Sequence, residues 1–316
     1  MSLLNKPNLE YIKNLYTNRR LKKIVNVYQQ TYINIKGQGF GDFLRGSIYL
    51  TYICIILGLE FEIDLTNHPI SEYLSYKGSP GNVLYSNIEA FIDYYNNLEN
   101  EQHFILKFIK KLNQHNEETY YLFNNFKPLF KIENPKFNII QKARDIIIPK
   151  IEPINLVLDQ LDNKLNLNNI KRNQYAVIQI RCGDFFMNIK KNIDSEKHQI
   201  SLKHINDIIT YINQCTHKNK KYILIGDSNK IKKYVASKFT NIITFDSKIT
   251  HLGEDVNINK NAIIDTLIDF NIMRFSNFII SFTAYGHGSG FSKYCSILYN
   301  IGFKQILLKP TLSYNV

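Results

Sequence analysis

The chain has 316 residues, of which 44% are hydrophobic and 21% charged, and its formal net charge is +12 at pH 7. This composition is typical of a folded globular protein and excludes an intrinsically disordered chain. The length allows two domains with separate cores. The longest apolar run, residues 53–57, is far shorter than a membrane span, and the N-terminal residues lack the features of a secretory signal. We therefore expect a cytoplasmic protein without an integral membrane segment.

The positive charge does not by itself predict a nucleic-acid partner. The lysines are spread along the chain, and no recognition motif or basic stripe with interleaved aromatic residues is present. A small phosphorylated ligand would suit a basic protein equally well. We expect no nucleic-acid partner.

Cysteine and histidine spacing argues against a structural metal site. The cysteines stand far apart, without a C-x-x-C pair, and the histidines form no H-E-x-x-H or related pattern. Reduced, unbridged thiols are the usual state in the cytosol. We expect no metal and no cofactor.

The first half of the chain opens with a strand–helix–strand pattern. Residues 31–36 are predicted to form a strand, residues 42–58 a largely buried helix, and residues 60–65 the next strand. Residues 85–130 are predicted to be helical, without a clear sheet pattern. A polar, Asn-rich linker is expected within residues 155–173, so the first domain is predicted to comprise residues 1–165.

The second half alternates short apolar strands with helices. The predicted strands are residues 175–180, 221–226, 241–245, 277–282 and 304–308, and the predicted helices are residues 201–215, 228–239, 261–276 and 290–301. Such alternation is typical of βαβ units and a parallel sheet. Residues 166–316 are therefore predicted to form a Rossmann-like domain, and the fold class is α/β.

Polar residues follow three of the predicted strands. Arg181 ends the first strand of the second half, Asp227 follows the second, and a glycine-rich loop, residues 281–292, follows the fourth. Ligands of open α/β sheets bind at the carboxyl ends of the strands. An arginine can hold phosphate oxygens bidentately, and a glycine-rich loop before a helix can direct N–H groups at an anion. The predicted ligand is a nucleotide pyrophosphate.

Each of these features also has a structural alternative. Arg181 could pair with a nearby carboxylate such as Asp184. The glycine-rich turn could be a simple helix cap. The earlier glycine-rich turn, residues 37–46, has G-x-G-x-G spacing, which departs from the dinucleotide fingerprint G-x-G-x-x-G.

The order of the motifs resembles the fucosyltransferase superfamily of GT-B glycosyltransferases. Residues 39–46 resemble its first turn, G-G-x-G-N-x-x-x-G, and residues 179–184 resemble its strand end H-[VI]-R-R-x-[DN]. Residues 226–228 match its acidic turn. Residues 268–281, followed by residues 289–292, match its last helix–strand–loop unit. The resemblance covers the second half well and little of the first half beyond its first turn.

Three positions depart from the family pattern. Gln179 stands where the family has histidine, Cys182 where it has a variable second arginine, and Asp42 where the first turn has asparagine. Arg181 matches the invariant arginine and is retained. The loss of the second arginine puts the identity of the donor in doubt.

The resemblance implies roles for individual residues. Arg181 would contact the β-phosphate of GDP and stabilise the leaving diphosphate. Apart from the resemblance, an inverting transfer needs a base for the acceptor hydroxyl, and Asp42 is a candidate because a carboxylate at the tip of the first domain would face the acceptor. Asp42 could instead cap a helix beginning at residue 43. The other residues expected at the donor are Gly39, Gly41, Arg45, Asp184, Asp227, Tyr285, His287, Gly288, Ser289, Gly290 and Phe291.

Several of these residues have a second interpretation. Asp227 could bind guanine or ribose, or only cap the next helix. Ser289 could contact phosphate, cap its helix, or do both. His287, a lone histidine in a loop, could simply be solvated. Arg45 could hold a phosphate or pair with Asp42.

The resemblance implies a GT-B fold, with two Rossmann-like domains facing a cleft, and transfer of fucose from GDP-fucose to a glycan or protein hydroxyl with inversion. The sequence contains no Asp-x-Asp, the motif with which GT-A enzymes hold Mn²⁺, so we expect no metal requirement. One alternative is a related transferase that uses another nucleotide sugar. Another is a degenerate protein that binds a glycan or a partner without catalysis.

Overall fold

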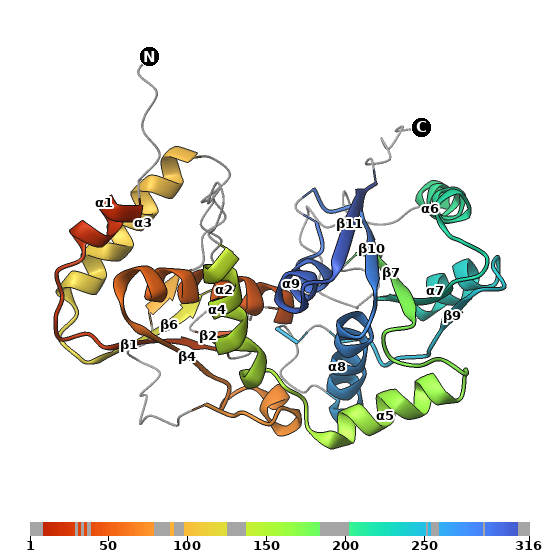
Figure 1. Ribbon diagram of the computed structural model, residues 1–316, viewed down its shortest axis with the longest axis horizontal. Helices are drawn as coiled ribbons and strands as arrows, with labels where there is room; N and C mark the ends of the chain where they lie inside the picture. The colour runs from red at the N-terminus through yellow and green to blue at the C-terminus, as the bar shows by residue number, and fades with distance from the viewer. Residues whose placement is uncertain are drawn as a thin grey trace, which may run out of the picture. The chain divides into compact units, whose positions relative to one another are not determined.

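The computed structural model describes residues 9–28, 31–32, 35–36, 39–78, 89–91, 98–124, 137–183, 202–250, 252–253, 259–286 and 288–308. The chain divides into two compact units. The first comprises Met1–Gln38 and Asp42–Glu152, and the second comprises Gly39–Gly41 and Pro153–Val316. Each unit contains a parallel sheet, which confirms the predicted α/β class (Figure 1). That the two units face a cleft stays a prediction.

The first unit is built on a four-stranded parallel sheet in the order β4-β1-β6-β5. Its strands are β1 (Lys23–Val27), β4 (Glu60–Asp64), β5 (Glu89–Phe91) and β6 (Thr119–Asn124), and a separate two-stranded pair consists of β2 (Thr31–Tyr32) and β3 (Ile35–Lys36). Its helices are α1 (Leu9–Leu15), α2 (Phe40–Leu57), α3 (Leu98–Gln114) and α4 (Phe137–Ile147), with 3₁₀ turns η1 (Pro69–Tyr73) and η3 (Ile148–Lys150).

Helix α2 carries the apolar run of the first unit. It is the one helix of the described residues that is long and apolar enough to cross a membrane, and 61% of that stretch is buried inside the structure. Its Ser47 accepts a hydrogen bond from the Asn26 side chain of β1 at 2.9 Å, and both residues are buried. Such burial is typical of a core helix, so the helix is weak evidence for a membrane span.

The strand predictions for the first half were partly wrong. The predicted strand at residues 31–36 is the short β2–β3 pair, whereas the strand that pairs with β4 is β1. Lys23 at the start of β1 and the polar Asn26 within it interrupt its apolar pattern. Residues 85–130 contain helix α3 as predicted, but they also contain β5 and β6, which extend the sheet.

The second unit is built on a five-stranded parallel sheet in the order β11-β10-β7-β8-β9. Its strands are β7 (Tyr175–Arg181), β8 (Lys221–Gly226), β9 (Ile242–Thr244), β10 (Phe278–Thr283) and β11 (Gly302–Leu307), and its helices are α5 (Asn155–Asn166), α6 (Leu202–Cys215), α7 (Asn229–Ala236), α8 (Lys260–Arg274) and α9 (Gly290–Tyr299). By chain order this is the 3-2-1-4-5 arrangement of a Rossmann-like domain.

Helices cover both faces of the second sheet. Helices α6 and α7 share a buried apolar core with one face, to which Ile178, Ile180, Leu224 and Phe282 contribute. Helix α9 packs against β10 and β11, and α8 packs against β7 and against helices α5 and α9. Figure 1 shows α8 and α9 on the side of the β7–β10–β11 strands away from α6 and α7.

The division between the units lies earlier than the predicted boundary at residue 165. Residues 155–173 were predicted as a linker, but they contain helix α5. This helix belongs to the second unit because its buried face, Val157, Leu161 and Leu165, recurs at helical spacing and α5 packs against α8. The polar residues between these positions concealed the helix in the sequence.

Candidate functional site

The order of the strands locates the candidate site. The chain runs outward from β7 to β8 on one side and to β10 on the other, so the switch point of the sheet lies between β7 and β10. Arg181, the last residue of β7, is the Cα partner of Thr283, the last residue of β10. The carboxyl ends of these two strands therefore meet where a ligand of an open α/β sheet is expected.

Arg181 is held by a buried carboxylate. Its NH1 donates to Asp227 Oδ2 at 2.7 Å, and Asp227 follows the neighbouring strand β8. Asp227 also accepts hydrogen bonds from the backbone N–H groups of Cys182 at 2.5 Å and Gly183 at 3.3 Å. The side chain of Asp227 is 8% exposed and that of Arg181 is 21% exposed. The guanidinium is thus fixed in position and still reached by solvent.

Two glycines allow this close arrangement. A Cβ added to Gly226 would lie 2.5 Å from the carbonyl oxygen of Ile180, so a side chain there would push β8 away from β7. Gly183 has φ +122°, a conformation that favours glycine. Together they bring Asp227 beside the backbone amides that follow Arg181.

The predicted alternatives for these two residues can now be separated. Asp227 does not cap helix α7, because Ser228 is the N-cap and its side chain accepts from Ile231 N. Asp227 is a carboxylate partner of Arg181, and the expected pairing with Asp184 stays a prediction because Asp184 lies outside the described residues. Whether Arg181 also binds a phosphate stays a prediction.

The loop between β10 and α9 folds toward Arg181. The ring of Tyr285 lies 5.5 Å from the guanidinium carbon of Arg181, within cation–π range. The backbone N–H of Tyr285 donates to Thr283 Oγ1 at 3.1 Å, and that of Gly288 donates to Tyr285 O at 3.0 Å. Gly288 has φ +86°, which suits a glycine at this turn.

A buried amide lies beneath this loop, and we did not predict a role for it. Gln179 Nε2 donates to Ser289 Oγ at 3.0 Å, while Gln179 Oε1 accepts from Ser281 Oγ at 2.6 Å and from Ser292 Oγ at 2.8 Å. Gln179 is 5% exposed and the three serines are buried. The available sequence signal was a polar residue two positions before Arg181 in an otherwise apolar strand.

The predicted residues at the start of α9 are brought together with this network. Ser289 has the backbone conformation of an N-cap, but its side chain makes no capping hydrogen bond. Gly290 and Phe291 form the first turn of α9. A Cβ added to Gly41 would meet the backbone of both, so Gly41 must be small here. Gly39 also clusters with this second unit.

Asp42 and Arg45 belong to the first unit and form an ion pair. Arg45 NH1 lies 3.1 Å from Asp42 Oδ1, and the Asp42 side chain is 38% exposed. One interpretation of the sequence was that Asp42 caps a helix beginning at residue 43. That interpretation was wrong, because α2 begins at Phe40 and Asp42 lies in its first turn. Burial and, to a lesser degree, the charge of Asp42 raise the pKa of Tyr28. His287 lies outside the described residues.

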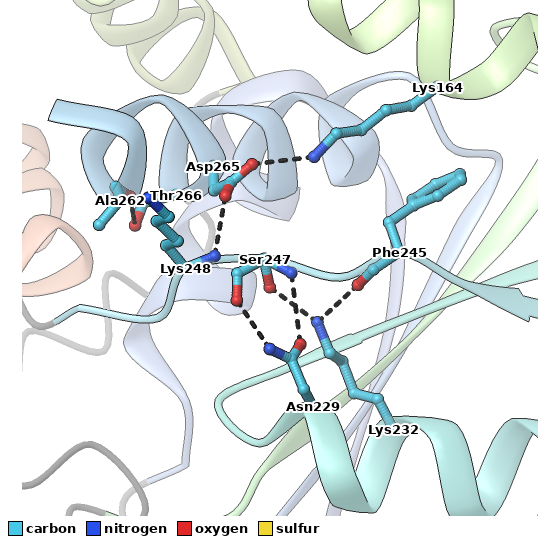
Figure 2. A network of polar contacts seen from close by, with 9 residues as sticks. All are labelled: Lys164, Asn229, Lys232, Phe245, Ser247, Lys248, Ala262, Asp265 and Thr266. Carbon is cyan, nitrogen blue, oxygen red and sulfur yellow. Dashed lines mark hydrogen bonds and ion pairs between the residues drawn. The ribbon is translucent and has the colours of Figure 1, made fainter. Parts of the chain in front are cut away.

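A second polar network holds the connection after β9 (Figure 2). The ammonium of Lys232, a residue of α7 that is 1% exposed, donates to Phe245 O at 3.0 Å and to Ser247 Oγ at 2.8 Å. The Asn229 side chain bonds both to Ser247 O at 2.8 Å and to Ser247 N at 3.3 Å. These bonds fix the segment at the carboxyl end of β9.

Helix α8 holds the same segment from its other side. Asp265 Oδ1 accepts from Lys164 Nζ at 2.8 Å, and Asp265 Oδ2 accepts from Lys248 N at 2.8 Å (Figure 2). Burial lowers the pKa of Lys232 and raises the pKa of Asp269 to about 6, with the positive charge of Lys232 opposing the change at Asp269. This network holds the segment that follows β9, the edge strand farther from the switch point on the β8 side of the sheet.

No cluster of three or more metal-ligating side chains occurs among the residues that the structure describes. Two comparisons found nothing: no protein-family model matches the chain, and no curated protein matches it.

Solved structures of fucosyltransferases are similar to the chain. NodZ α-1,6-fucosyltransferase soaked with GDP-fucose is 15% identical, with 88% of this chain and 92% of that chain covered and a TM-score of 0.47. Fucosyltransferase NodZ from Bradyrhizobium is 13% identical, with 88% and 93% covered and a TM-score of 0.49. POFUT1 in complex with GDP-fucose is 8% identical, with 93% and 76% covered and a TM-score of 0.33.

Proposed function

We propose that the chain is a glycosyltransferase that transfers fucose from GDP-fucose to a hydroxyl of a glycan or protein, with inversion and without a metal. The observation that carries this proposal is the position of Arg181, whose fixed and solvent-reached guanidinium ends the strand at the switch point of a Rossmann-like sheet. The motif around Arg181 is also the most specific part of the sequence resemblance.

The chemistry requires stabilisation of a leaving diphosphate. In an inverting transfer the acceptor oxygen attacks the anomeric carbon of the sugar while the bond from that carbon to the β-phosphate oxygen breaks. The electron pair of the broken bond goes to the diphosphate, so negative charge grows there. An arginine that is already oriented, here by Asp227, stabilises this charge without reorganising in the transition state.

The acceptor proton must go to a base. Asp42 is the candidate because it is a carboxylate in the first turn of α2, and its side chain is partly exposed in the structure. Arg45 holds one carboxylate oxygen of Asp42 at 3.1 Å and so orients the group. The role of Asp42 as the base is part of this proposal.

One observation favours the non-catalytic alternative. Arg181 is already paired with Asp227, as a purely structural arginine would be. However, Asp227 also accepts from two backbone N–H groups, so its charge is shared between three donors. In addition, the Arg181 side chain is 21% exposed, so an anion can still reach it, which supports an anion-binding role.

A donor screen tests the proposal. Binding of GDP, UDP and dTDP to the full chain is measured by calorimetry, and we expect GDP to bind most tightly. The second step measures release of GDP from GDP-fucose with a glycan mixture as acceptor. A preference for UDP would overturn the GDP assignment, and tight GDP binding without turnover under any acceptor would favour the non-catalytic alternative.

A further inference from the structure

The transfer step proposed above assigns no role to the buried side chain of Gln179. We propose that Gln179 is a positioning residue of the donor site: it anchors Ser289, and through the loop before Ser289 it keeps Tyr285 on the Arg181 guanidinium. This inference rests on the proposed function.

The amide of Gln179 joins three separate parts of the second unit. It lies on β7, and its partners lie on β10, at the end of the loop and on α9: Ser281, Ser289 and Ser292. Ser292 Oγ also lies 3.1 Å from Ser281 Oγ, so the hydroxyls are linked among themselves. Both ends of the amide are satisfied, which a buried amide requires.

The strand register places this network directly behind Arg181. Gln179 and Arg181 are two residues apart on β7, so their side chains leave the same face of the sheet. Their Cα partners on β10 are Ser281 and Thr283. The two residue pairs, Gln179 with Ser281 and Arg181 with Thr283, therefore follow one another along β7 and β10.

The loop from β10 to α9 is tied to this row at both ends. At its start, Thr283 Oγ1 holds the N–H of Tyr285. At its end, Gln179 holds the hydroxyl of Ser289, which for that reason does not cap α9. Between them, Gly288 N donates to Tyr285 O and closes the turn. Loss of the Ser289 anchor would open the turn and release Tyr285 from Arg181.

An apolar replacement should separate positioning from stability. Gln179→Met has a similar length but cannot accept from the serines or donate to Ser289. We expect Gln179→Met to weaken GDP binding about tenfold, as the loss of about 1.4 kcal/mol would. Gln179→His, assayed at pH 8 with a neutral ring, retains one acceptor and one donor and should restore most of the affinity.

The matched control is Asn271→Leu. Asn271 is another buried amide of the second unit, but its hydrogen bonds to Leu267 O and from Arg274 NH1 stay within α8. This variant should lower the melting temperature without changing GDP affinity. For each variant, the loss of GDP affinity is compared with the loss of stability. If the ratio of the two losses is the same for Gln179→Met and Asn271→Leu, Gln179 is only structural and the inference fails.

A double-mutant cycle tests the route through Ser289. If Gln179 acts through this residue, Gln179→Met should cost little further GDP affinity in a Ser289→Ala background, so the two effects will not add. Additive effects on GDP affinity would contradict the proposed route.

A measurement without ligand separates this inference from the proposed function. The amide hydrogen exchange of Gly288 reports the closed turn, and we expect it to accelerate in Gln179→Met and Ser289→Ala but not in Asn271→Leu. Unchanged exchange in Gln179→Met would overturn the anchoring role even if GDP binds. Accelerated exchange in a protein that does not bind GDP would preserve the anchoring role and overturn the proposed function.

Discussion

Arg181 and Asp227 lie at the ends of adjacent strands and form an ion pair whose carboxylate also accepts two backbone hydrogen bonds. The side chain of Asp227 is almost completely buried, whereas that of Arg181 reaches solvent. The buried carboxylate therefore orients the guanidinium, and part of the Arg181 side chain stays accessible to solvent at the strand ends. This arrangement also makes Asp227 the residue on which the geometry of the candidate site most depends.

We expect Asp227→Asn to destabilise the protein by about 1–3 kcal/mol, because the substitution leaves buried donors with a poorer acceptor. Its matched control is Asp246→Asn, which removes the ion pair between Asp246 and Lys233. That pair has a similar length, 2.8 Å, but the side chain of Asp246 is 66% exposed. That control should cost much less stability, because exposed ion pairs contribute little. Denaturant unfolding of both variants measures the difference, and equal losses would contradict the buried role of Asp227.

Replacement of Arg181 by lysine tests the catalytic role. Arg181→Lys keeps the positive charge but removes the planar fork that can hold two phosphate oxygens. If the contact strengthens in the transition state, kcat should fall more than GDP affinity. Loss of one preorganised donor typically lowers the rate by about 10²–10³-fold. Steady-state kinetics, calorimetry with GDP and thermal unfolding together give the answer.

Two results for Arg181→Lys would contradict the catalytic role. A variant that unfolds but retains its activity per folded molecule would show that Arg181 only supports the domain. A variant with normal kcat and weakened GDP binding would show that the arginine binds the donor equally in the ground state and the transition state.

The second half of the fold could be predicted because its strands are short and mostly apolar and alternate with helices, as Val177, Ile178 and Ile180 show in β7. In the first half, β1 was missed because its buried Asn26 is satisfied by Ser47 of α2, a pairing that local sequence does not reveal. The boundary was misplaced because α5 buries only three of its residues and presents a polar sequence elsewhere.

The candidate site was only partly predictable for a related reason. Arg181 stood out because a charged residue ends an apolar strand. A carboxylate partner for Arg181 was expected nearby in sequence, at Asp184, which lies outside the described residues, whereas the partner from the next strand, Asp227, was not anticipated. Gln179 was noted only as a departure from the family pattern, because its role depends on three serines far along the chain.

We expect transfer activity to survive chelation by EDTA. The reason comes from the sequence, which offers no Asp-x-Asp to hold a divalent ion, and from Arg181, whose positive charge can do the work of a metal at the diphosphate. Activity is measured with GDP-fucose before and after chelation. Complete loss that Mn²⁺ restores would contradict the prediction.

The final prediction concerns the pH dependence of stability through Asp269. Burial raises its pKa to about 6 from an ordinary 3.8, Lys232 and Lys164 oppose this change, and Asp265 adds to it. Between these two values the folded protein holds a proton that the unfolded chain has released, so this group makes the fold less stable as pH rises from 4 to 6. The accumulated loss is about 3 kcal/mol, since each pKa unit is worth about 1.4 kcal/mol.

Asp269→Asn removes the titration of this group. The stability of the variant relative to the unsubstituted protein should therefore improve by about that amount from pH 4 to pH 7. Denaturant unfolding at several pH values measures this difference, with Asp246→Asn as the exposed control, and a difference that stays flat or declines with pH would show that Asp269 does not titrate as described.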